Sequence, residues 1–262
     1  MTQETINPKP RPVKRRTRCI LLIGAIVAIT LGMGCIQRKL LYFPTHHENT
    51  NGLSQWSHED QVIGYARKVP APKNVWLMLH GNAGQAAGRG YALPSFSEDD
   101  SVFILEYPGY GKRKGTPSMK SFNTAATEAY EILRSEYSDT PVCIAGESIG
   151  SGPSCFIASS INPPDKVVIV VPFDNMASVA TEHVGSLLTT LLLRDKWDNI
   201  NALKDYDGPL EIYGAKKDTV IPIHHARALA ESRSQAKFHE IEGGHNDWSH
   251  GEKVKFRYSI EE

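Results

Sequence analysis

The sequence predicts an α/β fold built on a mostly parallel sheet. Apolar runs of strand length alternate with stretches of helical spacing, and several of these runs are almost wholly apolar. Such runs are typical of strands that are covered on both faces of a parallel sheet. The chain has 262 residues, which is enough for one large domain, and its 40% hydrophobic and 22% charged content is that of an ordinary globular protein.

The predicted elements follow one another from residue 61 to the end of the chain. We expect strands at 61–69, 74–80, 101–107, 142–145, 166–171, 207–214 and 236–241. We expect helices at 118–137, 151–160, 223–232 and 248–260. The clearest is 118–137, because Ala125, Ala129 and Leu133 recur at helical spacing. Residues 37–60 are expected to be an irregular lead-in.

The segment 173–202 shows no strand pattern, although it lies between two predicted strands. It contains the apolar pair Leu187-Leu188 and a tryptophan, Trp197. Its position suits a short cap inserted over a functional site, and it also suits a plain crossover helix.

The N-terminal 36 residues are not expected to belong to the fold. Residues 1–18 are basic and proline-rich, which is typical of disorder. Residues 19–36 are an uncharged apolar run, at the lower limit of what spans a bilayer. This run is either a transmembrane anchor or a lipoprotein-type signal that is cleaved before Cys35. In both cases the folded domain, 37–262, is tethered to a membrane on its non-cytoplasmic side.

Charge and cysteine content exclude several classes of function. The chain has 29 basic and 29 acidic residues, and this balance argues against a nucleic acid as partner. The four cysteines lack the spacing of a metal site, and Cys143 and Cys155 are expected to be small buried residues. No group of His, Asp and Glu shows a metal-site spacing either. We therefore expect neither a metal nor another cofactor.

One motif carries most of the chemical information. Residues 146–150 read Gly-Glu-Ser-Ile-Gly, between a predicted strand and a predicted helix. Gly-x-Ser-x-Gly in that context is the nucleophile elbow, a sharp turn that holds a serine hydroxyl out above the sheet. Ser148 is therefore the candidate nucleophile.

A serine needs a base and an acid to activate it, and the elbow predicts the chain order serine, acid, histidine. Reacting groups gather at the carboxyl ends of parallel strands. Asp218 follows the strand 207–214 by four residues and is the predicted acid. Asp174, which also follows a strand, is the alternative.

His245 is the predicted base. It lies just past the last strand in Gly243-Gly244-His245, where the glycines let the loop bend across the sheet. The alternatives are His239, within the strand, and His250, within the predicted last helix. Six other histidines are interpreted as structural or solvated: His46, His47, His58, His80, His224 and His225.

The predicted oxyanion hole combines two backbone N–H groups. One belongs to Ile149, which follows the nucleophile, and the other to Asn82, with Ala83 as the alternative. Asn82 and Ala83 lie in the glycine-containing loop 80–85 after the strand 74–80. His80 is interpreted as a structural residue that holds this loop.

These motifs resemble those of the α/β-hydrolases, and more narrowly the Bem46 group, relatives of the abhydrolase-domain 13 and 17 proteins. The matching stretches, in family order from residue 40 to about 255, are Leu40–Pro44, His80–Gly84, Tyr107–Gly111, Gly146–Gly150, Pro172-Phe173, Asp218–Pro222 and Gly244–Asn246. The resemblance implies triad roles for Ser148, Asp218 and His245. Two departures are the basic Lys112-Arg113-Lys114, where a serine is frequent, and Glu106, where an aspartate is common.

The expected function is a membrane-tethered serine hydrolase that cleaves carboxylic esters or thioesters through an acyl-enzyme. The expected partners are a small or lipid-like acyl ester, an acylated protein, and the membrane itself. The alternatives are a peptidase of the same fold and a catalytically inactive binding module. The sequence leaves the oligomeric state open.

Overall fold

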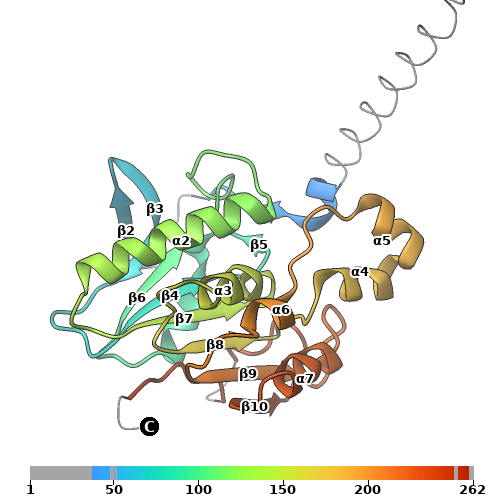
Figure 1. Ribbon diagram of the computed structural model, residues 1–262. Helices are drawn as coiled ribbons and strands as arrows, with labels where there is room; N and C mark the ends of the chain where they lie inside the picture. Colours follow the sequence, from blue (N-terminus) through green and yellow to red (C-terminus); the bar gives the residue numbers. More distant parts are fainter. Residues whose placement is uncertain (1–36, 48–49, 51, 251–252, 260–262) are drawn as a thin grey trace, which may run out of the picture.

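A central sheet of eight strands organises the computed structural model, which describes residues 37–47, 50, 52–250 and 253–259 (Figure 1). The strands are β2 (Ser54–His58), β3 (Gln61–Arg67), β4 (Val75–Leu79), β6 (Ser101–Leu105), β7 (Val142–Glu147), β8 (Val167–Val170), β9 (Leu210–Ala215) and β10 (Ala236–Ile241). Their order is β10-β9-β8-β7-β4-β6-β3-β2. The neighbours from β10 to β6 in this order all pair in parallel, whereas the pairs β6–β3 and β3–β2 are antiparallel, so only β3 runs in the opposite direction. The predicted mostly parallel sheet is confirmed.

The strand missing from the sequence prediction is β2. It is polar, reading Ser-Gln-Trp-Ser-His, and only Trp56 in it is buried. It lies at the edge of the sheet, where a strand needs few apolar residues. The lead-in is also less irregular than predicted, because β1 (Phe43–Pro44) pairs in parallel with β5 (Ala83–Gly84).

The helices surround this sheet. They are η1 (Ala86–Ser95), α2 (Met119–Glu136), η2 (Ser148–Gly150), α3 (Ser151–Ala158), α4 (Met176–Val184), α5 (Ser186–Leu192), α6 (Asn199–Leu203) and α7 (Ile223–Glu231), where η marks a 3-10 helix. Three of the four predicted helices, now α2, α3 and α7, are confirmed. Ser118 explains where α2 begins, because its hydroxyl accepts the backbone N–H of Ser121 while the Ser121 hydroxyl accepts that of Ser118.

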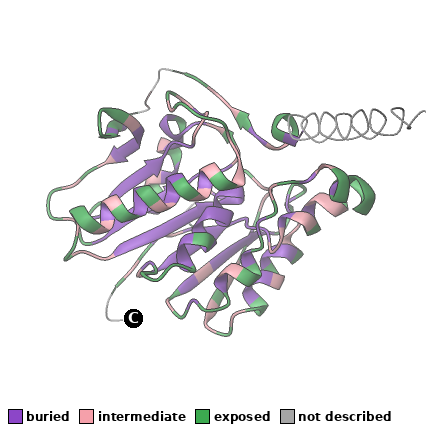
Figure 2. Ribbon diagram, turned by 45° about the horizontal axis from the view of Figure 1, so that its top comes forward, coloured by how far each residue is buried: buried purple, intermediate pink, exposed green. Residues whose placement is uncertain are grey.

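Two apolar cores lie on the two faces of the sheet. In β4, Leu77 and Leu79 belong to one core, and Trp76 and Met78 belong to the other. The first core is completed by α2, α3, α6 and α7, and the second by η1 and the C-terminal segment 253–259. Figure 2 shows the buried strands between the partly exposed helices. This double cover explains why the central strands are apolar throughout.

The predicted C-terminal helix, 248–260, is wrong. Residues 248–250 form a turn, and 253–259 run extended. Val254 and Phe256 are buried in the second core, and the ring of Phe256 stacks on Phe96 at 4.4 Å. The backbone N–H of Phe256 donates to the carbonyl of Ser95 at 2.9 Å. The strict alternation of basic and apolar residues from 253 to 258 is the signal of an extended segment with one buried face.

The segment 173–202, predicted as a cap or a crossover, forms three short helices between β8 and β9. Helices α4 and α5 extend beyond the end of the sheet, whereas α6 packs against α3 (Figure 1). The predictions for 1–18 and 19–36 lie outside the described residues. Within the described part of the chain, no helix is both long and apolar enough to cross a membrane.

Candidate active site

The turn after β7 has the strained geometry of a nucleophile elbow. Ser148 has a φ of 53°, a left-handed value that is rare for a residue with a side chain. Both flanking glycines are required, because a Cβ on Gly146 would lie 2.4 Å from Ser154 Oγ and one on Gly150 would lie 2.0 Å from the carbonyl oxygen of Leu79. Backbone strain at one residue, held by tight packing around it, is typical of functional sites.

The structure brings Ser148, Asp218 and His245 together, although they are far apart in the sequence. His245 Nε2 lies 2.8 Å from Ser148 Oγ, so the serine hydroxyl can donate to the imidazole. His245 Nδ1 lies 2.7 Å from Asp218 Oδ2, and it must donate because a carboxylate only accepts. The arrangement is a continuous relay from hydroxyl to imidazole to carboxylate.

Asp218 is held in place by its own loop. Its Oδ1 accepts the backbone N–H groups of Val220 and Ile221, both at 2.8 Å, which leaves Oδ2 for the histidine. The side chain is fully buried. The alternative acid, Asp174, faces another partner, since its Oδ1 lies 2.8 Å from Nδ1 of His225.

The other candidate histidines have structural contacts. His239 stacks on Tyr213, and His250 is an exposed residue 3.7 Å from Asp247. His80 is fully buried, and its Nδ1 lies 2.7 Å from the carbonyl oxygen of Gly81. Burial and the nearby Arg89 lower the pKa of His80, so it stays neutral. These contacts support a structural role for His80 in the loop after β4.

The two residues predicted to form the oxyanion hole line the same cavity as Ser148. Asn82 and Ile149 both border it, as does the alternative Ala83. The hydroxyl of Tyr110 donates to Asn82 Oδ1 at 3.1 Å, and this bond fixes the side chain of Asn82. The loop after β4 and the elbow after β7 therefore meet beside the serine.

A buried ion pair that the sequence analysis missed joins these two loops. Glu147, next to the nucleophile, accepts the backbone N–H of Gly81 at 2.9 Å and the indole N–H of Trp248 at 3.1 Å. Arg89 lies 3.5 Å from Glu147 and also donates to the carbonyl oxygen of Gly81. Burial alone would raise the pKa of Glu147, but Arg89 and these donors hold it below its usual range.

Removing the Glu147 charge is expected to destabilise the fold. Glu147→Gln keeps the size of the side chain but leaves Arg89 buried without its counter-charge, and breaking such a pair costs about 3–5 kcal/mol. The measurement is the free energy of unfolding of the full chain in urea. The control is Glu59→Gln, an exposed glutamate whose loss should cost less than about 0.5 kcal/mol.

The pH dependence separates this charge effect from a packing effect. The lowered pKa of Glu147 means that its stabilisation is complete above the ordinary carboxyl pKa of about 4.3 and is lost only as the pH falls through the lower folded-state value. The stability gap between wild type and Glu147→Gln should be constant from about pH 6 to 8 and should close in acid. A gap that persists in acid would contradict the charge interpretation.

An apolar cavity of about 540 Å³ opens beside the serine. Ser148 and His245 lie at its wall. Helices α4 and α5 contribute part of its apolar lining: Met176, Val179, Ala180, Val184, Leu188 and Leu192. The lead-in adds Leu40, Leu41 and Phe43. Such a volume suits a small ligand or an acyl chain.

The two sequence departures lie away from the reacting groups. Arg113 donates to the carbonyl oxygen of Glu106 and lies 3.8 Å from Glu128, so it supports the turn in which it lies. Glu106 is buried and accepts the backbone N–H of Ala86 at 3.1 Å. Among the described residues that line the cavity, none comes from the basic stretch 112–114.

Known proteins that resemble the chain include lipases. It is 29% identical to lysophosphatidylserine lipase ABHD12 of Rattus norvegicus over 216 residues, which cover 73% of the chain and 52% of the relative. It is 30% identical to protein ABHD12B of Homo sapiens, with coverage of 60% and 49%. The chain thus spans about half the length of these relatives. An uncharacterized protein of Mycobacterium tuberculosis is 28% identical, with coverage of 89% and 90%. No family model matches the chain.

Solved structures support the fold. An esterase of Pyrococcus furiosus superposes with a TM-score of 0.60 at 13% identity, covering 78% of this chain and 91% of that one. Est1E of Butyrivibrio proteoclasticus, with ferulic acid bound, gives 0.56 at 12% identity, covering 79% and 94%. At this level of identity the likeness concerns the fold alone. These structures show that the chain has the α/β-hydrolase fold.

Proposed function

We propose that the chain is a serine hydrolase that cleaves carboxylic esters of lipid-like acyl groups through an acyl-enzyme. The observation that carries the proposal is the relay Ser148–His245–Asp218 at the wall of an apolar cavity. A serine activated in this way attacks a carbonyl carbon, and the apolar cavity offers room for the acyl chain.

The proposed reaction follows from the geometry of the relay. His245 Nε2 takes the proton of Ser148 as the oxygen attacks, and Asp218 holds the imidazole by its Nδ1–H and stabilises the imidazolium. The backbone N–H groups of Asn82 and Ile149 receive the developing oxyanion. The imidazolium then gives its proton to the leaving alcohol. Water activated by His245 releases the acid and restores the serine.

The lining of the cavity supports a lipid-like substrate over a small polar one. Besides the buried apolar wall, Val184 of α4 and Leu188 of α5 are about half exposed, and Leu40 of the lead-in is more exposed still. The relatives named lysophosphatidylserine lipase suggest a lysophospholipid as one member of this class. A thioester such as an S-acylated protein would meet the same relay and remains a second substrate to test.

Tethering to a membrane is part of the proposal. The apolar run 19–36 directly precedes the lead-in, and the described chain begins at the cavity, since Gln37 borders it. An anchor or lipid at that point would bring the cavity to the bilayer, where acyl substrates are concentrated. The basic stretch 14–18 before the run favours a domain on the non-cytoplasmic side, by the positive-inside rule.

Chain-length preference tests the substrate class. With p-nitrophenyl esters from acetate to palmitate, kcat/KM of the full chain should rise at least about tenfold between acetate and the medium-chain esters, because each buried methylene stabilises by about 0.8 kcal/mol.

Two leucines of α5 give a matched pair of variants for this test. Leu188 and Leu191 are 48% and 50% exposed, but only Leu188 lines the cavity. Leu188→Ser should reduce the preference for long chains and Leu191→Ser should leave it unchanged. Equal effects, or activity on acetate alone, would contradict the proposal.

The two alternative functions differ in what they predict. A peptidase of this fold would also cleave peptide substrates, as an aminopeptidase or a dipeptidyl peptidase. A binding module would bind an acyl ligand without turnover, although the intact relay of Ser148, His245 and Asp218 favours an enzyme.

A further inference from the structure

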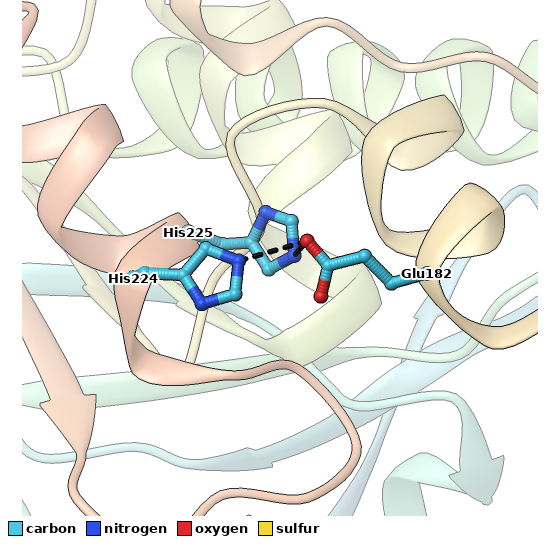
Figure 3. A group of neighbouring side chains, drawn as sticks. All are labelled: Glu182, His224 and His225. Atoms are coloured by element: carbon cyan, nitrogen blue, oxygen red, sulfur yellow. Dashed lines mark hydrogen bonds and ion pairs between the residues drawn. The ribbon is translucent and has the colours of Figure 1, made fainter.

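A second cluster of side chains that can bind a metal ion lies outside the triad, between helices α4 and α7. Glu182, near the end of α4, reaches toward His224 and His225 at the start of α7 (Figure 3). Its Oε1 lies 2.8 Å from His224 Nε2 and 3.3 Å from His225 Nε2. The three ligand atoms lie within 4.8 Å of one another, and this is the one such group among the described residues.

We propose that Glu182, His224 and His225 bind a divalent transition-metal ion, with Zn²⁺ as the preferred occupant, and that this ion fastens α4 to α7. Two imidazole nitrogens and one carboxylate oxygen are a ligand set that zinc accepts, with the remaining position open to water. In a tetrahedral zinc site neighbouring ligand atoms lie about 3.3 Å apart. The separations of Glu182 Oε1 from the two histidine nitrogens, 2.8 and 3.3 Å, are close to this value.

The contacts of the His225 ring support a cation at this position. Its Nδ1 lies 2.8 Å from Asp174 Oδ1, and a carboxylate can only accept, so Nδ1 carries a proton. Nε2 of the same ring faces the carboxylate of Glu182, whose Oε1 is 3.3 Å away. The side chain is only 2% exposed, and Nε2 is buried without a hydrogen-bond partner. A buried ring nitrogen without a hydrogen-bond partner, held beside a carboxylate oxygen, offers a cation two ligand atoms at one position.

Asp174 plays the part that a carboxylate plays behind many metal-binding histidines. By accepting the Nδ1–H of His225 it fixes the tautomer and directs Nε2 toward the ion. This gives a role to the aspartate that the sequence analysis considered as a triad acid. The sequence prediction of no metal site rested on spacing, and Glu182 and His224 are too far apart in the chain for spacing to link them.

The position of the cluster defines what the ion would do. His183, the neighbour of Glu182, has its Nε2 2.8 Å from the carbonyl oxygen of Val220, and both residues border the cavity. An ion at Glu182 would therefore hold α4 against the loop that runs from Asp218 to α7. The ion would rigidify the wall of the cavity without touching Ser148.

Direct binding measurements test the site. The full chain, in detergent and without a polyhistidine tag, is freed of metal with a chelator and dialysed against Zn²⁺, and bound zinc is measured by mass spectrometry of the elements. We expect one equivalent per chain at about 10 µM free Zn²⁺. Glu182→Gln and His224→Gln should each weaken binding at least about tenfold, and Asp174→Asn about 10- to 100-fold. The control is His58→Gln, which removes an exposed histidine paired with Glu59.

The outcomes separate a specific site from chance binding. Three outcomes would each overturn the proposal. The first is that the wild type binds no zinc at about 100 µM. The others are an unchanged zinc affinity in both Glu182→Gln and His224→Gln, and an equal loss of affinity in His58→Gln. A second measurement tests whether the ion links α4 to α7. Zn²⁺ should slow backbone hydrogen exchange in residues 176–184 in the wild type but not in Glu182→Gln. Unchanged exchange in the wild type would overturn this link. The Ser148→Ala variant should bind zinc like the wild type, so this test is independent of the proposed hydrolysis.

Discussion

Ser148→Ala is expected to remove ester hydrolysis almost entirely. The hydroxyl at 2.8 Å from His245 Nε2 is the only atom in the relay that can form the acyl-enzyme. In other triads, loss of the serine costs on the order of 10⁶-fold in kcat. The measurement is kcat for the best p-nitrophenyl ester, with circular dichroism and the urea midpoint to show that the variant folds.

A small side-chain change at the elbow should not disturb folding. Alanine keeps the Cβ that the left-handed backbone at Ser148 already carries, and the glycines that make the turn possible are unchanged. The matched control is Ser154→Ala, because Ser154 is also buried near the elbow but donates to the carbonyl oxygen of Gly150 and not to His245. If a folded Ser148→Ala retained wild-type kcat, the nucleophile would have to be another residue.

Asp218→Asn is the second large effect that we expect. An amide in place of the carboxylate can donate to Nδ1 of His245 and favour the wrong tautomer, in which Nε2 carries the proton and cannot accept one from Ser148. The corresponding change in other triads lowers kcat about 10⁴-fold. KM should change much less, since Asp218 does not border the cavity among the described lining residues. The measurement is the full kcat and KM of the folded variant.

Asp174→Asn discriminates between the two acids. Asp174 contacts His225 and not His245, so this variant should keep kcat within a few-fold of the wild type while losing affinity for zinc. A 10⁴-fold loss in Asp174→Asn and none in Asp218→Asn would reverse the assignment of the acid.

The parts of the fold that the sequence predicted have strong local signals. The apolar runs of β4, β7 and β8 are buried on both faces, so their pattern survives any tertiary context. The candidate triad could be predicted for a related reason. The elbow motif has a steric cause and identifies the serine. The expected chain order and the positions of the strand ends then leave few candidates for the acid and the histidine. Ser148, Asp218 and His245 meet because parallel strands bring their carboxyl ends to one edge.

The missed features depend on partners that are distant in the chain. The alternation of basic and apolar residues from 253 to 258 indicates an extended segment, but its packing partner, Phe96, is known only from the fold. The pairing of Glu147 with Arg89 and the cluster of Glu182 with His224 are set by tertiary packing in the same way. In each case the residue type indicated which interaction the side chain could make, and only the fold showed its partner.

Labelling with a fluorophosphonate tests the central claim most directly. The probe reacts covalently with a serine only when a neighbouring base activates it, and intact-mass spectrometry with peptide mapping locates the adduct. The full-length wild type should be labelled once, at Ser148, while Ser148→Ala should stay unlabelled and Asp218→Asn should react far more slowly. A folded wild type that does not react, or an adduct on a different serine, would contradict the account.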